Sequence, residues 1–289
     1  MRIGFIGLGN MGGGMAANLA KAGHEVHAFD LAPAALARAQ ENGCTPHDTA
    51  RAAAEGADAI ITMLPNGGIV KSVVMADVIG VAPKGALLID SSTIDVATTR
   101  EMGEAAVAAG YRFVDAPVSG GIAAANGGTL AFMVGGSDAD FAAADAVLQP
   151  MAKAVIHAGG IGAGQIAKTC NNMILGATMI VTCEAFAMAQ KLGLDPQVFY
   201  DISSKATGQS WSMTSYCPVP GVGPTAPSDN GYQGGFAAAL MLKDLKLAMA
   251  AAQDAGAKVE MGALAEKVYA QFAEAGHGGM DFSGIITAL

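Results

Sequence analysis

Three polar residues, Lys168, Asn171 and Asn172, lie close together in the segment GAGQIAKTCNN. On a helix, the spacing i, i+3 and i+4 places their side chains on one face. An amine grouped with two amides could take a proton from a bound hydroxyl group and hold that group by hydrogen bonds. The same residue types near the start of a helix are also common on solvated surfaces. Their function therefore depends on the elements that position them.

The segment 162–192 predicts one long helix around these residues. It contains no proline and one internal glycine, Gly176, and it ends before Gly193. Glycine at the C′ position takes a positive φ without penalty. At about 1.5 Å per residue the helix would span roughly 40 Å, enough to pass from one domain into another.

The part of this helix from residue 173 to residue 189 is apolar around its whole circumference. It is interrupted by Thr182 and Glu184 and is short for a bilayer span, so we predict no membrane insertion. An apolar helix outside a membrane is expected to be buried on all sides. One small helical domain can hardly cover it, and we predict that a second subunit does so in a homodimer or homotetramer.

The N-terminal residues predict a nucleotide-binding turn. A short β-type run, Arg2 to Gly7, leads directly into GLGNMG, which opens a helical pattern. In a G-x-G-x-x-G turn the first glycine permits the tight turn, the second lets the backbone approach a pyrophosphate, and the third packs helix on strand. The candidate cofactor-binding residues here are Gly7, Leu8, Gly9, Asn10, Met11 and Gly12.

A second predicted strand, Glu25 to Phe29, ends in Asp30. An acid at this distance from the glycines accepts hydrogen bonds from the adenosine ribose. Its carboxylate would repel a 2′-phosphate, and the following residues, Leu31, Ala32 and Pro33, offer no cation to hold one. We therefore predict NAD rather than NADP.

Strand and helix patterns alternate as far as residue 151, which predicts a doubly wound, mostly parallel sheet. Ligands of such sheets bind beyond the carboxyl ends of the strands. Three segments fall there: MLP, DSST and DAPVSGG. In the last, a serine hydroxyl and the N–H groups of two glycines could bind a carboxylate. The residues concerned are Met63, Leu64, Pro65, Thr93, Ser119, Gly120 and Gly121.

Composition limits the remaining possibilities. A chain of 289 residues with 52% hydrophobic residues is expected to form two domains. We place a Rossmann-type dinucleotide-binding domain at 1–162, the long interdomain helix at 163–193 and an all-α domain at 194–289. The net charge of −9 argues against nucleic acid as a partner. The four cysteines have no metal-ligand spacing, so we predict reduced thiols in a cytoplasmic protein and no metal site.

The motifs together resemble those of the β-hydroxyacid dehydrogenases. They are GLGNMGGGMAANL, DSST, DAPVSGGIAAANGGTLAFMVGG, GAGQIAKTCNN and GFAAALMLKDLKLA, in the family's order over nearly the whole chain. The stretch GQSWSMTSYCPVPGV is similar to the 3-hydroxyisobutyrate dehydrogenase branch. The resemblance implies NAD-dependent oxidation of a small β-hydroxyacid to its semialdehyde, with 3-hydroxyisobutyrate, an intermediate of valine catabolism, as the expected substrate.

The resemblance also implies roles for individual residues. Lys168 would be the catalytic acid/base and Asn172 would help to hold the substrate, whose carboxylate would lie on Ser119, Gly120 and Gly121. Asn171, Trp211 and Asp244 are further substrate-binding candidates. Thr93, Met63, Leu64 and Lys243 would border the cofactor, and Phe236 would pack near its nicotinamide.

The expected chemistry needs a base, because the hydroxyl proton must leave as hydride moves to the nicotinamide. None of the five histidines falls in a predicted strand-end motif, which leaves lysine. Desolvation and the positive nicotinamide ring both favour the neutral amine. Tartronate semialdehyde, succinic semialdehyde and serine-like substrates remain alternatives. A non-catalytic NAD-binding scaffold and an imine reductase are the alternatives from other functional classes.

Overall fold

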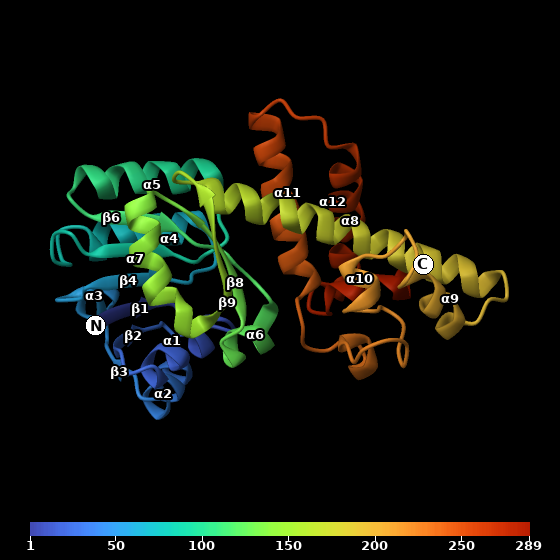
Figure 1. Ribbon diagram of the computed structural model, residues 1–289, viewed down its shortest axis with the longest axis horizontal. Coiled ribbons are helices and arrows are strands. Elements are labelled where there is room, and N and C mark those ends of the chain that lie inside the picture. Colours follow the sequence, from blue (N-terminus) through green and yellow to red (C-terminus); the bar gives the residue numbers. More distant parts are fainter. The chain divides into compact units, whose positions relative to one another are not determined.

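The computed structural model describes Met1–Leu289 and divides the chain into two compact units, residues 1–168 and 169–289. The first is a sheet with helices and the second is helical. Helix α8, Ala163–Lys191, begins in the first unit and continues into the second (Figure 1). The predicted fold class is confirmed: a mostly parallel Rossmann-like sheet, then a long helix and a helical C-terminal part.

The sheet of the first unit has nine strands. Its order is β3-β2-β1-β4-β5-β6-β8-β7, with β9 paired to β8. The pairs from β3 to β6 are parallel, whereas β8 runs antiparallel to β6 and β7. The strands are β1 Arg2–Ile6, β2 Glu25–Phe29, β3 Thr45–Pro46, β4 Ala59–Thr62, β5 Leu87–Asp90, β6 Arg112–Asp115, β7 Val118–Ser119, β8 Leu130–Gly135 and β9 Ala152–Gly159.

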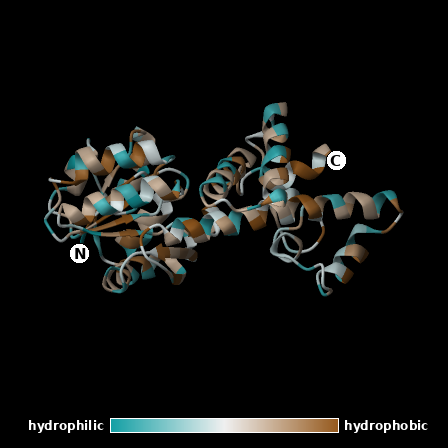
Figure 2. Ribbon diagram, turned by 90° about the horizontal axis from the view of Figure 1, so that it is seen from above, coloured by the Kyte–Doolittle hydropathy of each residue, from teal (hydrophilic) through white to brown (hydrophobic).

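Alternate strand residues enter two separate cores, one on each face of this sheet. In β1, Phe5 joins one core and its neighbour Ile6 joins the other. Both faces are covered, so the central strands β1 and β4 are mostly apolar, and Figure 2 shows brown strands in the sheet. The covering helices are α1 Gly12–Lys21, α2 Pro33–Glu41, α3 Ala50–Ala54, α4 Gly67–Val73, α5 Val96–Ala108, α6 Gly121–Gly127 and α7 Asp138–Leu148.

Strand β9 was not predicted from the sequence. It pairs in parallel with β8, but its residues are only partly buried, and Lys153 and His157 interrupt its apolar pattern. An edge strand pairs on one side only and carries such polar residues without loss. Hydrophobic periodicity is therefore a weak signal at this edge.

The second unit packs helices around a core that includes Met179, Met241, Leu245 and Tyr269. Its helices after α8 are α9 Pro196–Ser203, α10 Trp211–Thr214, α11 Ala238–Asp254 and α12 Glu260–Phe272. The internal glycine of α8, Gly176, lets α11 approach closely. A Cβ atom there would lie 3.2 Å from the Leu245 side chain and 3.2 Å from the sulfur of Met241.

Helix α8 ends as the sequence predicted. Gly193 has φ +85°, and the N–H of Leu194 donates to the carbonyl oxygen of Ala189. These are the backbone conformation and the hydrogen bond of a glycine-terminated helix.

The expectation that α8 is buried all round is not met within one chain. Ile174, Val181 and Met188, spaced by seven residues, are 61%, 56% and 61% exposed. By length and hydropathy alone the helix could also cross a membrane. These three exposed apolar residues form one stripe, however, because a seven-residue spacing returns to the same helix face.

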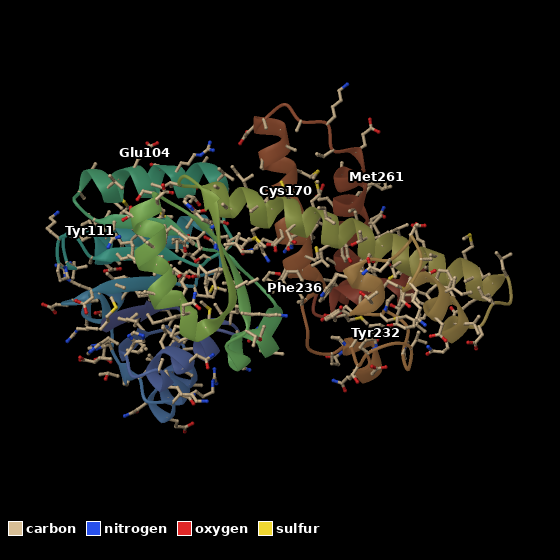
Figure 3. The ribbon with its side chains drawn as sticks, viewed as in Figure 1. Glu104, Tyr111, Cys170, Tyr232, Phe236 and Met261 are labelled. Carbon is tan, nitrogen blue, oxygen red and sulfur yellow. The ribbon has the colours of Figure 1, made fainter.

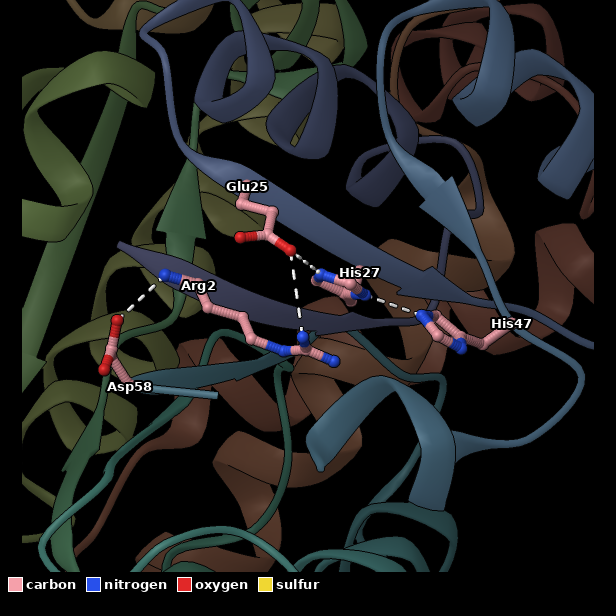
Figure 4. A network of polar contacts seen from close by, with 5 residues as sticks. All are labelled: Arg2, Glu25, His27, His47 and Asp58. Atoms are coloured by element: carbon pink, nitrogen blue, oxygen red, sulfur yellow. Dashed lines mark hydrogen bonds and ion pairs between the residues drawn. The ribbon is translucent and has the colours of Figure 1, made fainter. Parts of the chain in front are cut away.

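A polar network lies across the first two strands of the sheet (Figure 4). His27 is buried, and its Nε2 is 2.7 Å from Glu25 Oε1. Its Nδ1 is 2.6 Å from Nε2 of His47, which directly follows β3. Arg2 is 3.7 Å from the same Glu25 oxygen. One of the two imidazoles donates to the other, so His47 extends a hydrogen-bonded chain that runs from Glu25 through His27.

Candidate functional site

The glycine turn joins β1 to α1 and is tightly constrained at both ends. Gly7 has φ +99°, and a Cβ there would meet the carbonyl oxygen of Met63 at 2.3 Å. A Cβ on Gly12 would clash in the same way with the carbonyl oxygen of Gly7. Gly9 differs from both, because nothing lies within 4 Å of its Cβ position. The backbone at Gly9 is therefore open to a ligand.

Helix α1 begins at this turn without a side-chain cap, since its N-cap residue is Met11. The first N–H groups of a helix lack intrahelical partners and favour an anion such as a phosphate. Room at Gly9 and an uncapped helix start fit the pyrophosphate of a dinucleotide.

Asp30 follows β2 and already contacts the glycine turn. Its Oδ2 accepts a hydrogen bond from the N–H of Leu8 at 2.6 Å, and its Oδ1 accepts one from the N–H of Ala32 at 2.8 Å. The next side chain, Leu31, is 90% exposed and carries no charge. A ribose could thus meet the Asp30 carboxylate, with no cation from residues 31–33 beside it.

The ends of β4 and β5 are tied together. The N–H of Leu64 donates to Ser92 Oγ at 2.9 Å, which joins the MLP and DSST segments. Beneath them Asp90 is buried and accepts from Thr62 Oγ1 at 2.8 Å and from the N–H of Ser92 at 3.1 Å. Burial raises the pKa of Asp90 to about 6. Met63, Pro65 and Thr93 lie in these two joined segments.

The DAPVSGG segment leaves β6, forms the short strand β7 and turns into α6. Ser119 is half-buried, and Gly120 and Gly121 have φ +133° and +72°. Nothing lies within 4 Å of the Cβ position of Gly121. The open backbone at Gly121 and the nearby Ser119 hydroxyl are suited to a carboxylate.

Lys168 belongs to the first unit and lies one turn into α8, with only 7% of its surface exposed. Lysine is almost never this buried unless it interacts with other groups. A burial this deep distinguishes Lys168 from an ordinary surface lysine.

In the second unit, three of the predicted residues form one hydrogen-bonded group. The side-chain amide of Asn171 donates to Asn172 Oδ1 at 3.0 Å. The amide of Asn172 donates in turn to Asp244 Oδ2 at 2.5 Å, and Lys243 Nζ lies 3.5 Å from Asp244 Oδ1. Asn172 and Asp244 are both buried. Within this unit the structure therefore joins α8 and α11 through polar side chains.

Trp211 and Phe236 are linked through two residues that the sequence did not single out, Tyr216 and Asp281. Trp211, 51% exposed, stacks on Tyr216 with ring centroids 4.8 Å apart. The Tyr216 hydroxyl donates to Asp281 Oδ2 at 2.8 Å, and the same oxygen accepts from the N–H of Phe236 at 2.7 Å. Figure 3 labels Phe236 just before α11. Buried Asp281 was missed because its partners lie 65 and 45 residues away.

Known proteins are similar to this chain along nearly its whole length. Residues 2–160 match a family model described as the NAD binding domain of 6-phosphogluconate dehydrogenase. Residues 162–289 match one described as NAD-binding of NADP-dependent 3-hydroxyisobutyrate dehydrogenase. A 3-hydroxyisobutyrate dehydrogenase of Pseudomonas aeruginosa is 49% identical over 98% of this chain and 96% of its own. The chain belongs to the 3-hydroxyisobutyrate dehydrogenase family.

Other members of the 3-hydroxyisobutyrate dehydrogenase family show the same extent of likeness. The mitochondrial enzyme of Drosophila melanogaster is 44% identical over 97% of this chain and 87% of its own. A solved structure of the Mycobacterium tuberculosis 3-hydroxyisobutyrate dehydrogenase with L-serine is 47% identical, with a TM-score of 0.95, and the match covers 99% of this chain and 98% of that one. The chain is thus an oxidoreductase that acts on a CH–OH group and has NAD(P)-binding domains.

Proposed function

We propose that the chain oxidises 3-hydroxyisobutyrate to methylmalonate semialdehyde, the step expected in valine catabolism, with NAD as the cofactor. The observation that carries this proposal is the deep burial of Lys168 in a chain 49% identical to a 3-hydroxyisobutyrate dehydrogenase over nearly its full length. NAD, when bound, accepts the hydride. We assign residues 1–162 to NAD binding, 163–193 to the connecting helix and 194–289 to the helical domain, in a cytoplasmic enzyme.

The residues of the chain handle the proton and the substrate. The Lys168 amine accepts the hydroxyl proton during oxidation and returns it during reduction. Asn172 holds the substrate hydroxyl, with its amide oriented by Asp244 at 2.5 Å. Ser119 and the N–H groups of Gly120 and Gly121 bind the carboxylate, and Asn171 and Trp211 complete the substrate contacts.

The cofactor proposal rests on the first unit. Gly7, Leu8, Gly9, Asn10, Met11 and Gly12 would hold the pyrophosphate, Asp30 the ribose, and Met63, Leu64, Pro65, Thr93, Lys243 and Phe236 the remaining surface of the cofactor. The matched family description names NADP-dependent enzymes. We favour NAD because the Asp30 carboxylate would repel a 2′-phosphate and no cation follows it.

We also propose a homodimer or homotetramer. The stripe of Ile174, Val181 and Met188 on α8 is exposed in the single chain, and a second copy would remove it from water. A bilayer fits this helix poorly, because its other faces pack inside the chain, where Asn172 and Thr182 are buried, and it also carries the exposed Glu184.

A substrate panel tests the reaction. The purified protein is given 3-hydroxyisobutyrate, L-serine, glycerate or 4-hydroxybutyrate with NAD, and NADH formation is followed. We expect the highest kcat/KM with 3-hydroxyisobutyrate. A higher value with glycerate or 4-hydroxybutyrate would instead favour a tartronate or succinic semialdehyde reductase. Absence of NADH formation with every hydroxyacid would indicate a non-catalytic NAD-binding scaffold.

A further inference from the structure

The first turn of α8 rests directly on two strands of the sheet, β8 and β6. A Cβ atom on Gly164 would lie 2.2 Å from the carbonyl oxygen of Met133 in β8 and 2.8 Å from the Asp115 carboxylate in β6. Both distances are too short for any side chain. Glycine at this position therefore lets the helix backbone reach the sheet.

Asp115 then holds the start of the helix by its backbone. Its Oδ1 accepts from the N–H of Gly162 at 2.7 Å and its Oδ2 from the N–H of Gln165 at 2.9 Å. These N–H groups belong to the residue before α8 and to the first turn of α8, where no intrahelical acceptor exists. A carboxylate is also favoured by the helix dipole at this end. Asp115 is fully buried, so both hydrogen bonds are shielded from water.

Gln165 makes a second attachment, to the segment after β5. Its side chain is fully buried, with Nε2 donating to the carbonyl oxygen of Ser92 at 2.7 Å and Oε1 accepting from the N–H of Ile94 at 3.2 Å. The residue between these two contacts is Thr93. One amide thus bridges the helix to the DSST loop, some seventy residues away in the chain.

We propose that Asp115 and Gln165 are positioning residues for Lys168. Lys168 follows Gln165 by three residues, about 4.5 Å along the axis. Helix hydrogen bonds hold the backbone between them, so a shift at Gln165 displaces Lys168. The two attachments fix the Lys168 backbone against the loops that carry Thr93 and Ser119. This inference rests on the acid/base role proposed for Lys168. A misplacement of about 1 Å in a catalytic group can cost roughly 100-fold in rate.

The test compares two variants that each lose two hydrogen bonds between a side chain and the backbone. Gln165→Met keeps the side-chain length but releases Ser92 and Ile94. Tyr111→Phe is the matched control, because the Tyr111 hydroxyl accepts from the N–H of Gly80 at 2.8 Å and donates to the carbonyl oxygen of Ala82 at 3.0 Å. Tyr111 follows α5 in the same unit, as Figure 3 shows. Neither of its two hydrogen bonds involves a residue of α8.

Rates are expressed per NADH-binding site, found by titration, so that unfolded protein is not counted. We expect Gln165→Met to lower kcat at least ~10-fold with the Kd for NADH within about 3-fold of wild type. Tyr111→Phe should keep kcat within about 2-fold. Equal kcat losses in the two variants, or none in Gln165→Met, would overturn the positioning role.

A third variant covers the case in which Gln165→Met fails to fold. In Gln165→Glu the ionised carboxylate faces the carbonyl oxygen of Ser92 and repels it, whereas the protonated form can donate to it. We expect kcat relative to wild type to recover as the pH falls. A ratio independent of pH would contradict the proposal.

Lys168→Ala, measured in parallel, distinguishes failure of the acid/base role of Lys168 from failure of the positioning role of Asp115 and Gln165. If it keeps kcat, the acid/base role is wrong and the positioning role falls with it. If it loses kcat while the Gln165 variants do not, only the positioning role is wrong.

Discussion

The side-chain amide of Asn172 on α8 donates a hydrogen bond to the carboxylate of Asp244 on α11, with 2.5 Å between Nδ2 and Oδ2. Both residues are buried. A hydrogen bond between a neutral donor and a charged acceptor contributes roughly 1.5–3 kcal/mol in such a setting. The amide of Asn172 is thereby held in one orientation.

This pair gives the first prediction. Asp244→Leu leaves the Asn172 amide without its acceptor, and we expect kcat/KM for the hydroxyacid to fall about 10-fold, equivalent to about 1.4 kcal/mol. Asp244→Asn keeps an acceptor oxygen and should lose less than about 3-fold. Steady-state kinetics of the two variants provide the measurement. Equal losses in both would show that the charge, rather than the hydrogen bond, matters.

A second prediction concerns Lys168. Lys168→Ala should lower kcat by ~100-fold or more, the lower end of the contribution of acid–base catalysis. The Kd for NAD should barely change, because the glycine turn and Asp30 remain. Lys168→Arg should fail nearly as badly, since a guanidinium stays protonated and cannot accept a proton. A near-normal kcat in the alanine variant would refute the proposed mechanism.

The third prediction concerns cofactor choice. With the Asp30 carboxylate in place and no cation in residues 31–33, kcat/KM with NAD should exceed that with NADP by at least ~10-fold. The double variant Asp30→Ser, Leu31→Arg removes the repulsion and supplies a cation, so the preference should reverse. Leu31 is 90% exposed, so the new arginine meets no steric obstacle. A wild type that used both cofactors equally would contradict the argument.

The fourth prediction concerns assembly. Light scattering of the wild type should give a mass at least twice 28.8 kDa at micromolar concentration. Val181→Glu places a charge in the exposed stripe of α8 and should shift the mass toward that of one chain. Val107→Glu is a control, because Val107 is also about half exposed but lies on α5 in the first unit. A monomeric wild type would refute the proposed oligomer.

The last prediction concerns pH. Burial, followed by the charges of His27 and Arg2, lowers the pKa of His47. A histidine whose pKa is lower in the folded protein than in the unfolded protein binds fewer protons when folded. Its contribution to stability is therefore present above the unfolded value of about 6.5 and is lost as the pH falls below it.

The variant His47→Gln isolates this effect. Glutamine can still donate to Nδ1 of His27 but does not titrate. The free energy of unfolding, measured in urea at several pH values, should fall more steeply below pH ~6.5 in the wild type than in the variant. The buried carboxyls Asp90 and Asp115, both with pKa raised to about 6 by burial, are common to the two proteins and cancel in the difference. A difference that did not depend on pH would contradict the prediction.

Local patterns predicted most of the fold. The glycine turn, the alternating apolar segments and the glycine-terminated α8 are all encoded by neighbouring residues, and the structure has them where they were expected. Strand β9 and the exposed stripe of α8 were not predicted. How far β9 and the stripe of α8 are buried depends on which neighbouring element covers each of them. The periodicity of apolar residues carries no information about that neighbour.

The supporting residues of the site were the least predictable. Gln165 meets Ser92 across 73 residues, and Asp281 meets Tyr216 across 65. A buried polar side chain is identified by its partners, and those partners adjoin it only after folding. A glutamine or aspartate in the sequence gives no sign of such a contact.

The hydrogen bond between Asp30 and the N–H of Leu8 shapes how a nucleotide would meet the chain. The turn that would receive the pyrophosphate and the acid that would receive the ribose already hold each other at 2.6 Å in the protein alone. The receptor surface is thus preorganised, and little loop entropy remains to be lost on association. Cofactor binding should then occur at a preformed site, without a rearrangement of the loop around the ligand.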